Sequence, residues 1–313
     1  MTTKIFLLFF LADFSCGQTS QQPAQNKSDN REAFSDTLNG SRNSKLDSVN
    51  NGFIVPVGRM RTARAVHTAI LLKNGSVLIC GGFAGSALSS AEIYDPTSKA
   101  FKDVGQMSVA RAGHSATLLP DGKVLIVGGY NGNYLSSTEI FNPQTQTFSV
   151  GPIMNSPRSG QTATLLNNGK IVFTGGVVIG WSFLESGELY NIQTKTFSPT
   201  GSMTTARESH TATLLENGNV LITGGHKGRR ASIKIYSSAE IYDPTSEKFR
   251  SVGNITKVRH KHDAVMLADE RVLITGGSDE RDSEGAYVSA ELYDPVSSSF
   301  NAVRNMNLTR YKQ

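Results

Sequence analysis

The stretch HSATLLPDGKVLIVGG, residues 114–129, is one of five copies of a single pattern in this chain of 313 residues. Each copy has a mainly apolar tetrad followed by a double glycine. The five copies lie at residues 77–82, 124–129, 171–176, 220–225 and 272–277. An internal repeat of this kind defines the architecture, and it is therefore considered before any single motif.

Each copy also has polar and aromatic residues at fixed distances from its double glycine. Fifteen residues before the second glycine stands a histidine, replaced once by Gln161, and three residues earlier stands an arginine. The arginines are Arg64, Arg111, Arg158, Arg207 and Arg259. Downstream comes a glutamate two residues before a Tyr or Phe, and the glutamates are Glu92, Glu139, Glu188, Glu240 and Glu291. Because buried charges need partners, we expect this Arg and this Glu to form ion pairs or hydrogen bonds that join the units.

Each unit of 47 to 52 residues predicts four strands, which in the second copy are HSATLL, KVLIVGG, STEIFNP and TFSVG. We call them a, b, c and d. Asn-Gly or Asp-Gly between strands a and b in four copies predicts a two-residue type I′ hairpin. Asp-Pro or Asn-Pro ends strand c in four copies, since proline cannot donate to a ladder. Four-stranded antiparallel units at this period are typical of propeller blades, so the predicted fold class is all-β.

The apolar tetrad, the double glycine and the two spaced aromatic residues closely resemble the kelch repeat over residues 53–313. The resemblance implies a kelch β-propeller with five recognisable four-stranded blades, in which strand a lines the central channel. Residues 53–64 match a d strand with its following loop, and residues 306–313 match the start of another unit, with Arg310 at the repeat arginine. The ring is therefore expected to be either five blades with an extra N-terminal d-type strand or an incomplete six-blade ring.

The N-terminal region has the composition of an exported protein. Residues 1–16 combine Lys4 with a short apolar run and small residues, which predicts a signal peptide. Cys16 resembles the lipid-bearing cysteine of a bacterial lipoprotein signal, and a lipid there would attach the protein to a membrane. Residues 17–52 are rich in Gln, Asn and Ser and predict a disordered polar tether before the propeller at 53–313. We expect a cell-envelope lipoprotein or a secreted or periplasmic protein.

The stretch VRHKHDAVML, residues 258–267, could suggest a metal site because His260 and His262 would share one face of a strand. His262 is the fifth member of the repeated histidines, so we interpret it as part of the architecture. His260 falls outside the repeat, where the other units have Ala65, Ala112, Ser159 and Glu208. A metal pair at these histidines remains the alternative, but we predict no metal and no cofactor.

The face that carries the variable b-to-c connections and the d-to-a connections is the expected place for recognition, since variable loops on a rigid scaffold commonly carry function. The candidate binding residues are Trp181, His226, Lys227, Arg229, Arg230, Lys234 and His260. The plainer interpretation is that Trp181 covers its own blade and that the basic residues form a solvated loop. The predicted ligand is a protein, peptide or glycan. Nucleic acid is not expected, because a net charge of +5 comes without a basic block.

An enzyme is the competing class of function. Kelch propellers also carry copper-radical sugar oxidases and periplasmic sialic-acid mutarotases. The oxidases need an adjacent Tyr-His pair and a cysteine crosslinked to tyrosine, and this sequence has no Tyr-His dipeptide. The mutarotases would use Arg and Glu in the channel and leave no recognisable motif. The sequence therefore predicts a binding module that is not an enzyme.

Overall fold

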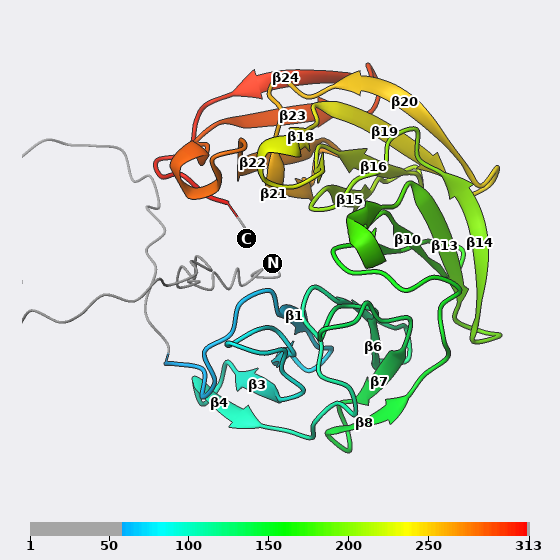
Figure 1. The fold of residues 1–313 in the computed structure, drawn as a ribbon, viewed down its shortest axis with the longest axis vertical. Helices are drawn as coiled ribbons and strands as arrows, with labels where there is room; N and C mark the ends of the chain where they lie inside the picture. Colours follow the sequence, from blue (N-terminus) through cyan, green and yellow to red (C-terminus); the bar gives the residue numbers. More distant parts are fainter. Residues whose placement is uncertain (1–57, 312–313) are drawn as a thin grey trace, which may run out of the picture. The chain divides into compact units, whose positions relative to one another are not determined.

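The computed structural model describes residues 58–311, which fold into five four-stranded antiparallel sheets (Figure 1). Strands a to d follow one another in every sheet. Blades 1 and 2 comprise β1 (Thr68–Leu71), β2 (Val77–Cys80), β3 (Ala91–Asp95), β4 (Ala100–Asp103), β5 (Ser115–Leu118), β6 (Val124–Val127), β7 (Thr138–Asn142) and β8 (Thr147–Val150). Blade 3 comprises β9 (Thr162–Leu165), β10 (Lys170–Thr174), β13 (Ser186–Asn191) and β14 (Thr196–Ser202). Blades 4 and 5 comprise β15 (Thr211–Leu214), β16 (Val220–Thr223), β19 (Ser238–Asp243), β20 (Lys248–Asn254), β21 (His260–Met266), β22 (Val272–Ser278), β23 (Ala290–Asp294) and β24 (Ser299–Val303).

The longer connections between strands b and c contain short elements of their own. In blade 3 these are β11 (Val177–Val178), the 3-10 turn η1 (Ile179–Trp181) and β12 (Ser182–Phe183). In blade 4 they are β17 (His226–Lys227), η2 (Arg230–Ser232) and β18 (Lys234–Ile235), and in blade 5 there is η3 (Asp282–Gly285). The variable length noted in the sequence is thus used to build small hairpins and turns on one side of the propeller. We call this side, which also carries the d-to-a connections, the loop-side face.

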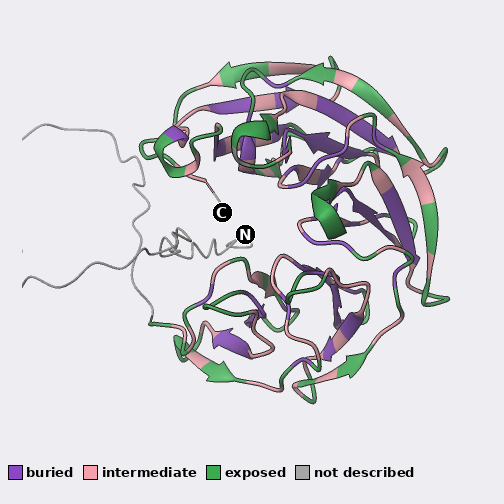
Figure 2. Ribbon diagram, viewed as in Figure 1, coloured by how far each residue is buried: buried purple, intermediate pink, exposed green. Residues whose placement is uncertain are grey.

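The blades are arranged side by side around an axis, with strand a innermost and strand d outermost (Figure 1). Successive inner strands contact one another from β1 through β5, β9 and β15 to β21. The b and c strands are buried, whereas the outer d strands are largely exposed (Figure 2). The five blades form an arc, and no described strand lies between blade 5 and blade 1 in Figure 1. The prediction of an all-β propeller with five four-stranded blades is confirmed.

Hydrophobic clusters between neighbouring blades form the core. Leu78 and Cys80 of blade 1, for example, pack with Val124 and Ile126 of blade 2. Within each blade, the repeated Tyr or Phe of strand c packs against the Phe of strand d at 4.8 to 5.1 Å between ring centroids. Because a Leu or Ile of one b strand fills the space beside the next blade, each blade needs a neighbour to bury its apolar face.

The double glycine is required where two blades meet. Both glycines of blade 3 have positive φ, 64° at Gly175 and 96° at Gly176. A Cβ on Gly175 would lie 2.4 Å from the carbonyl oxygen of Arg207 and 2.8 Å from Cε1 of His210, both from blade 4. A side chain there would clash with the next blade, so the glycine and the following histidine recur together.

The repeated arginine and glutamate form a buried ion pair in every blade. In blade 2, Nη2 of Arg111 lies 3.0 Å from Oε1 of Glu139, and Nη1 donates to the carbonyl oxygen of Gly128 at 2.8 Å. The backbone carbonyl of the same arginine accepts from the amide of Gly82 in blade 1 at 2.9 Å. The carbonyls of Arg158, Arg207 and Arg259 accept in the same way from the preceding blade, so the arginines of blades 2 to 5 each connect two blades. The equivalent pairs in blades 1, 3, 4 and 5 have distances of 2.8 to 2.9 Å.

The a-to-b turns differ from the predicted type I′ hairpin. In blade 1 the amide of Gly75 donates to the carbonyl of Leu72, and only Gly75 has positive φ, at 86°. This is a type I turn followed by one left-handed residue, so the asparagine before the glycine keeps an ordinary backbone. The type I′ prediction was wrong, because a turn of this length needs positive φ at one residue rather than two. In blade 5 the left-handed residue is Glu270, with φ of 68°.

Arg310 takes the place of a repeat arginine on blade 5. Its carbonyl accepts from the amide of Gly277 at 2.7 Å, as Arg111 does from Gly82. Its guanidinium donates to the carbonyl of Thr309, at a partly exposed position. Residues 53–57, where the extra d-type strand was predicted, lie outside the described residues, as do the predicted signal peptide and tether. No helix within residues 58–311 is long and apolar enough to cross a membrane.

Candidate functional site on the loop-side face

A repeated pair of positions borders the inner strands on the loop-side face. In each unit the residue two before the repeat histidine bridges the residue that follows the double glycine. The bridges are Ala65 to Phe83, Ala112 to Tyr130, Ser159 to Val177 and Glu208 to His226, and in blade 5 His260 pairs with Ser278 within the sheet. The Glu and His residues of this set, Glu208, His226 and His260, all lie in blades 4 and 5. At the same backbone positions, blades 1 and 2 have Ala, Phe and Tyr.

Trp181 and Arg229 stack on one another across blades 3 and 4. The guanidinium carbon of Arg229 lies 3.5 Å from the centre of the Trp181 ring, which is the geometry of a cation–π contact. Nη2 of Arg229 also lies 3.4 Å from Oε1 of Glu208. Trp181 is 53% exposed, and it has a left-handed backbone with φ of 57°. The two side chains that the sequence proposed separately therefore form one unit at the surface.

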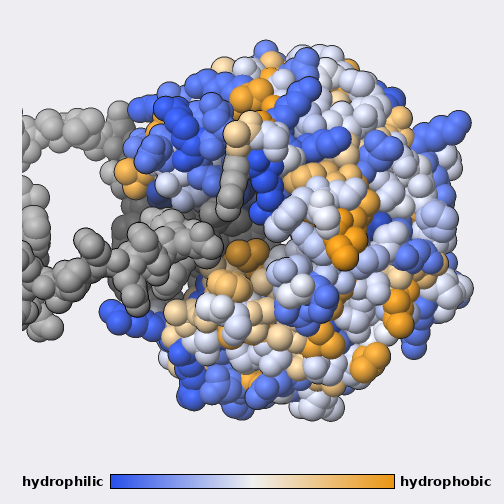
Figure 3. Space-filling view, viewed as in Figure 1, coloured by the Kyte–Doolittle hydropathy of each residue, from blue (hydrophilic) through white to orange (hydrophobic). Residues whose placement is uncertain are grey.

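Aromatic residues of blade 2 extend this unit. The rings of Tyr134 and Trp181 meet edge to face at 6.3 Å, and Tyr134 contacts Tyr130 at 5.0 Å. Tyr130 is partly exposed and Ile179, in η1, is strongly exposed. On the loop-side face, hydrophobic residues gather over η1, whereas the surface over blade 5 is mainly hydrophilic (Figure 3). Tyr130, Tyr134, Ile179, Trp181 and Arg229 are called the aromatic–arginine surface below.

His226 and His260 meet beneath this surface. Their Nδ1 atoms are 3.1 Å apart, and the two rings are nearly perpendicular. Nε2 of His226 lies 3.1 Å from Oε1 of Glu208. His260 is 1% exposed and His226 is 6% exposed, so neither ring presents an atom to a ligand at the surface. The structure places His260 in contact with His226 of the neighbouring blade.

The remaining predicted residues are more peripheral. Lys227 and Lys234 are exposed on the β17–β18 hairpin, and Nζ of Lys234 lies 5.8 Å from the ring centre of Tyr236. The side chain of Arg230 lies outside the described part of the chain. Sequence reasoning missed Glu208 and Tyr134. Glu208 could have been found, since it occupies the repeat position that drew attention to His260.

The repeated histidines have a different environment. Nε2 of His210 contacts the hydroxyl groups of Thr162 and Thr174 in blade 3, at 3.1 and 3.0 Å. Burial, together with the charge of Arg207, lowers the pKa of His210 to about 3. His114 has the same position between blades 1 and 2, and burial again lowers its pKa to about 3. These imidazoles are therefore neutral, and they join neighbouring blades by hydrogen bonds.

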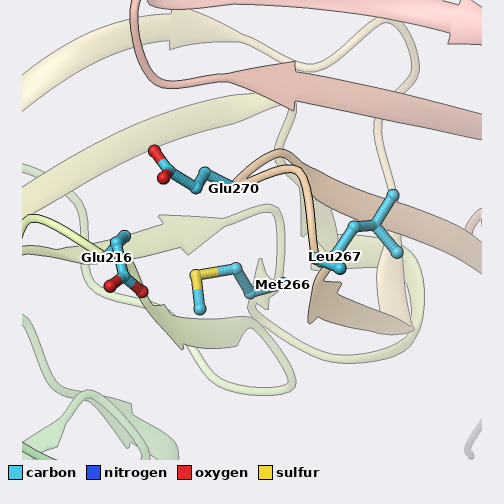
Figure 4. Close-up of a pocket in the computed structure, with 5 residues that line it drawn as sticks. Glu216, Met266, Leu267 and Glu270 are labelled. Carbon is cyan, nitrogen blue, oxygen red and sulfur yellow. The ribbon is translucent and has the colours of Figure 1, made fainter. Parts of the chain in front are cut away.

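The described residues contain no group of three or more His, Cys, Asp or Glu side chains placed to hold a metal ion. A hollow of about 320 Å³ lies on the opposite face, at the a-to-b turns of blades 4 and 5. It is lined by Glu216, Met266, Leu267, Ala268 and Glu270. In Figure 4 the side chain of Leu267 points away from those of Glu216, Met266 and Glu270. With two carboxylates and no basic group in its lining, this hollow does not form a recognition site for an acidic ligand.

Comparison with known proteins agrees with this architecture. Residues 64–108 and 110–155 each match the Kelch motif. No curated protein matches the chain in sequence. Among solved structures, the one described as "Structure of YjhT" superposes with a TM-score of 0.66 at 12% identity, covering 77% of this chain and 84% of that chain. At that identity the similarity concerns the fold alone.

The prediction that the protein is not an enzyme is contradicted by this structural match. A fold shared with another protein does not decide between binding and catalysis, so the absence of an oxidase motif does not exclude an enzyme. The fold supports a protein-interaction or a carbohydrate-related module.

Proposed function

We propose that this kelch-repeat β-propeller recognises a protein partner through the aromatic–arginine surface, with Trp181 and Arg229 as its anchors. The observation that carries the proposal is the exposed Trp181 in a left-handed backbone conformation. A bulky residue with positive φ is strained, and such strain is concentrated at functional sites. Burial does not offset this strain, since about half of the side chain faces solvent.

The anchors are held in place before any partner binds. Arg229 lies between the Trp181 ring at 3.5 Å and the Glu208 carboxylate at 3.4 Å. Side chains that are already ordered lose less entropy on association, which favours affinity. Trp, Tyr and Arg are also the residue types that dominate the binding energy of protein interfaces.

The charges around the anchors favour an acidic segment of the partner. Lys227, Arg229 and Lys234 are all exposed on the b-to-c connection of blade 4. Among residues 58–311 the Arg229 guanidinium has one carboxylate contact, at 3.4 Å, and it can still donate to a better-placed carboxylate of a ligand. We therefore propose a protein segment that combines an apolar side chain with Asp or Glu.

A peptide and glycan array probed with the full-length protein tests this proposal. We expect acidic peptides with an apolar residue to bind, and Trp181→Gly or Arg229→Ala to weaken them about 30-fold, which corresponds to a hot spot of about 2 kcal/mol. Val296→Ala is the matched control, because Val296 is 92% exposed on the opposite face and should not affect binding. Binding to glycans alone, or equal binding by both anchor variants, would contradict the proposal.

We also propose export, on the sequence of residues 1–52 alone. The short apolar run predicts a signal, and Cys16 is the candidate lipid attachment site. Mass spectrometry of the mature N-terminus after cell fractionation tests both points. A cytoplasmic protein that keeps Met1 would contradict export, and a mature chain that begins after Cys16 would contradict lipidation.

A further inference from the structure

Four groups in blades 4 and 5 form an unbroken series of close polar contacts. Oε1 of Glu208 lies 3.1 Å from Nε2 of His226, and Nδ1 of His226 lies 3.1 Å from Nδ1 of His260. Nε2 of His260 lies 3.2 Å from the carbonyl oxygen of Asp279. Both ends of the series are oxygen acceptors. We call these groups the His226–His260 series.

The number of hydrogens in the series follows from its atoms. Three contacts between electronegative atoms need three hydrogens, but two neutral imidazoles supply only two. Nε2 of His260 faces only oxygen atoms and must carry a hydrogen, which leaves its Nδ1 as a bare lone pair. The hydrogen between the rings must then come from Nδ1 of His226. Nε2 of His226 faces a carboxylate, so a third hydrogen is needed there.

Three carboxylates and three basic groups surround the series, so their charges balance before a proton is added. On the acidic side, Glu208 contacts His226 directly, and Oδ1 of Asp282 lies 3.3 Å from Nε2 of His260. The side chain of Asp279 pairs with Arg281 at 2.6 Å. On the basic side, Lys261 contacts Asp282 and Arg229 contacts Glu208.

The neighbouring repeat histidines also bear on where the proton resides. His210 lies near His226, and His262 lies near His260; burial lowers the pKa of both repeat imidazoles, so neither competes for the proton. Burial, Lys261 and His226 lower the pKa of His260 to about 4. His226 is in direct contact with the carboxylate of Glu208.

We propose that the His226–His260 series binds one proton at neutral pH, carried as an imidazolium on His226 between the Glu208 carboxylate and the neutral His260 ring. The proton connects blade 4 to blade 5 on the loop-side face. It also fixes the carboxylate that holds Arg229 against Trp181. The other blades have Ala65, Phe83, Ala112, Tyr130, Ser159 and Val177 at the matching positions, so among residues 58–311 only the joint between blades 4 and 5 pairs two histidines there.

A metal ion is the alternative occupant of the space between the two rings. Zinc bound by two imidazoles at 2.0 to 2.1 Å in tetrahedral geometry separates their nitrogens by about 3.3 Å. The observed separation is 3.1 Å, and the described residues bring no third ligand. A hydrogen bond between the two rings fits a separation of 3.1 Å and needs no further ligand.

Nitrogen NMR of the imidazole rings in the full-length protein detects the proton without any partner. At pH 7.5 we expect one of the two rings to be protonated on both nitrogens and the other on Nε2 alone. His210→Gln is the matched control, because blade 3 has Gln161 at that position, and it should leave both signals unchanged. Two neutral rings, or a stoichiometric metal ion with neither Nδ1 protonated, would overturn the proposal.

The pH dependence of unfolding gives a second measurement. Histidines of the unfolded chain lose their protons above a pKa of about 6.5. Because the folded protein keeps one proton there, raising the pH shifts the folding equilibrium toward the unfolded state. All six histidines can bind protons in the unfolded chain, so each variant is compared with the wild type. Between pH 7 and 8 we expect the unfolding equilibrium constant of the wild type to rise about eightfold relative to that of His226→Gln or His260→Ala. Relative to His210→Gln it should hardly change. An equal change in all four proteins would overturn the proposal.

Discussion

Blade 2 and blade 5 are built on the same repeat, yet they use it differently. Both have the buried arginine and the buried histidine of the repeat, at Arg111 and His114 in blade 2. Two residues before that histidine, blade 2 has Ala112 and blade 5 has His260. Positions that hold the blades together are thus constant, whereas the adjacent position on the loop-side face differs. A buried histidine can therefore join neighbouring blades as part of the repeat at one position, whereas a histidine two residues before it belongs to a hydrogen-bonded polar cluster.

The largest expected effect is common to both blades. Arg111→Met and Arg259→Met each leave a buried glutamate without its partner, which costs about 3 to 5 kcal/mol. Equilibrium denaturation in urea should show similar losses in the free energy of unfolding for the two variants. A loss confined to one blade would mean that the arginines are not equivalent.

The next largest effect is on the pH dependence of stability, and it distinguishes the buried repeat histidines from solvent-exposed histidines. The pKa of His114 is lowered to about 3 in the folded protein, so below pH 6.5 the unfolded state binds the proton more readily. Stability should therefore fall as the pH decreases, by about 1.4 kcal/mol per pH unit for this residue. His114→Gln should reduce the slope of the unfolding free energy between pH 6 and 4. An unchanged slope would contradict the buried neutral state.

The position that distinguishes the two blades has a smaller effect. His260→Ala, which copies blade 2, leaves His226 without its partner and should cost about 1 to 3 kcal/mol at pH 7. The triple variant Glu208→Ala, His226→Phe, His260→Ala copies the joint between blades 1 and 2 and should cost less than the single change. Thermal unfolding of the two variants tests this order. A larger loss in the triple variant would mean that the joint depends on its polar residues.

The smallest effect concerns the a-to-b turn, where blade 2 has Gly122 and blade 5 has Glu270. Both have positive φ, at 89° and 68°. Glu270→Gly should relieve backbone strain and stabilise the protein by about 0.5 to 1 kcal/mol. Gly122→Glu should destabilise it by a similar amount, since a Cβ there meets only the Lys73 side chain at 3.5 Å. Equal melting temperatures for both variants and the wild type would contradict the role of the left-handed residue.

The repeat in the sequence predicted the blades because every copy packs against its neighbours in the same way. The spacing of Arg158, Gln161 and the double glycine at 175–176 is fixed by the close approach of successive blades, so it is visible without a structure. The type I′ turn was wrong for a local reason. An Asn-Gly dipeptide fits two turn types, and the hydrogen bond that distinguishes them spans residues outside the dipeptide.

The candidate site could be predicted only in part. Trp181 and Arg229 were found as separate residues of two variable loops, because unusual side chains in such loops are visible in the sequence. Their stacking was not predictable, since they are 48 positions apart and belong to different blades.

The one-dimensional pattern was sufficient for the strand order, the blade count and the roles of the repeated residues, because contacts between successive copies recur at a fixed separation along the chain. The contact between His226 and His260 has no such regularity. It depends on how a hairpin of one blade lies against the first strand of the next, and that arrangement is set by packing in three dimensions. Only the folded structure could therefore show that two histidines outside the repeat share one buried site with Glu208.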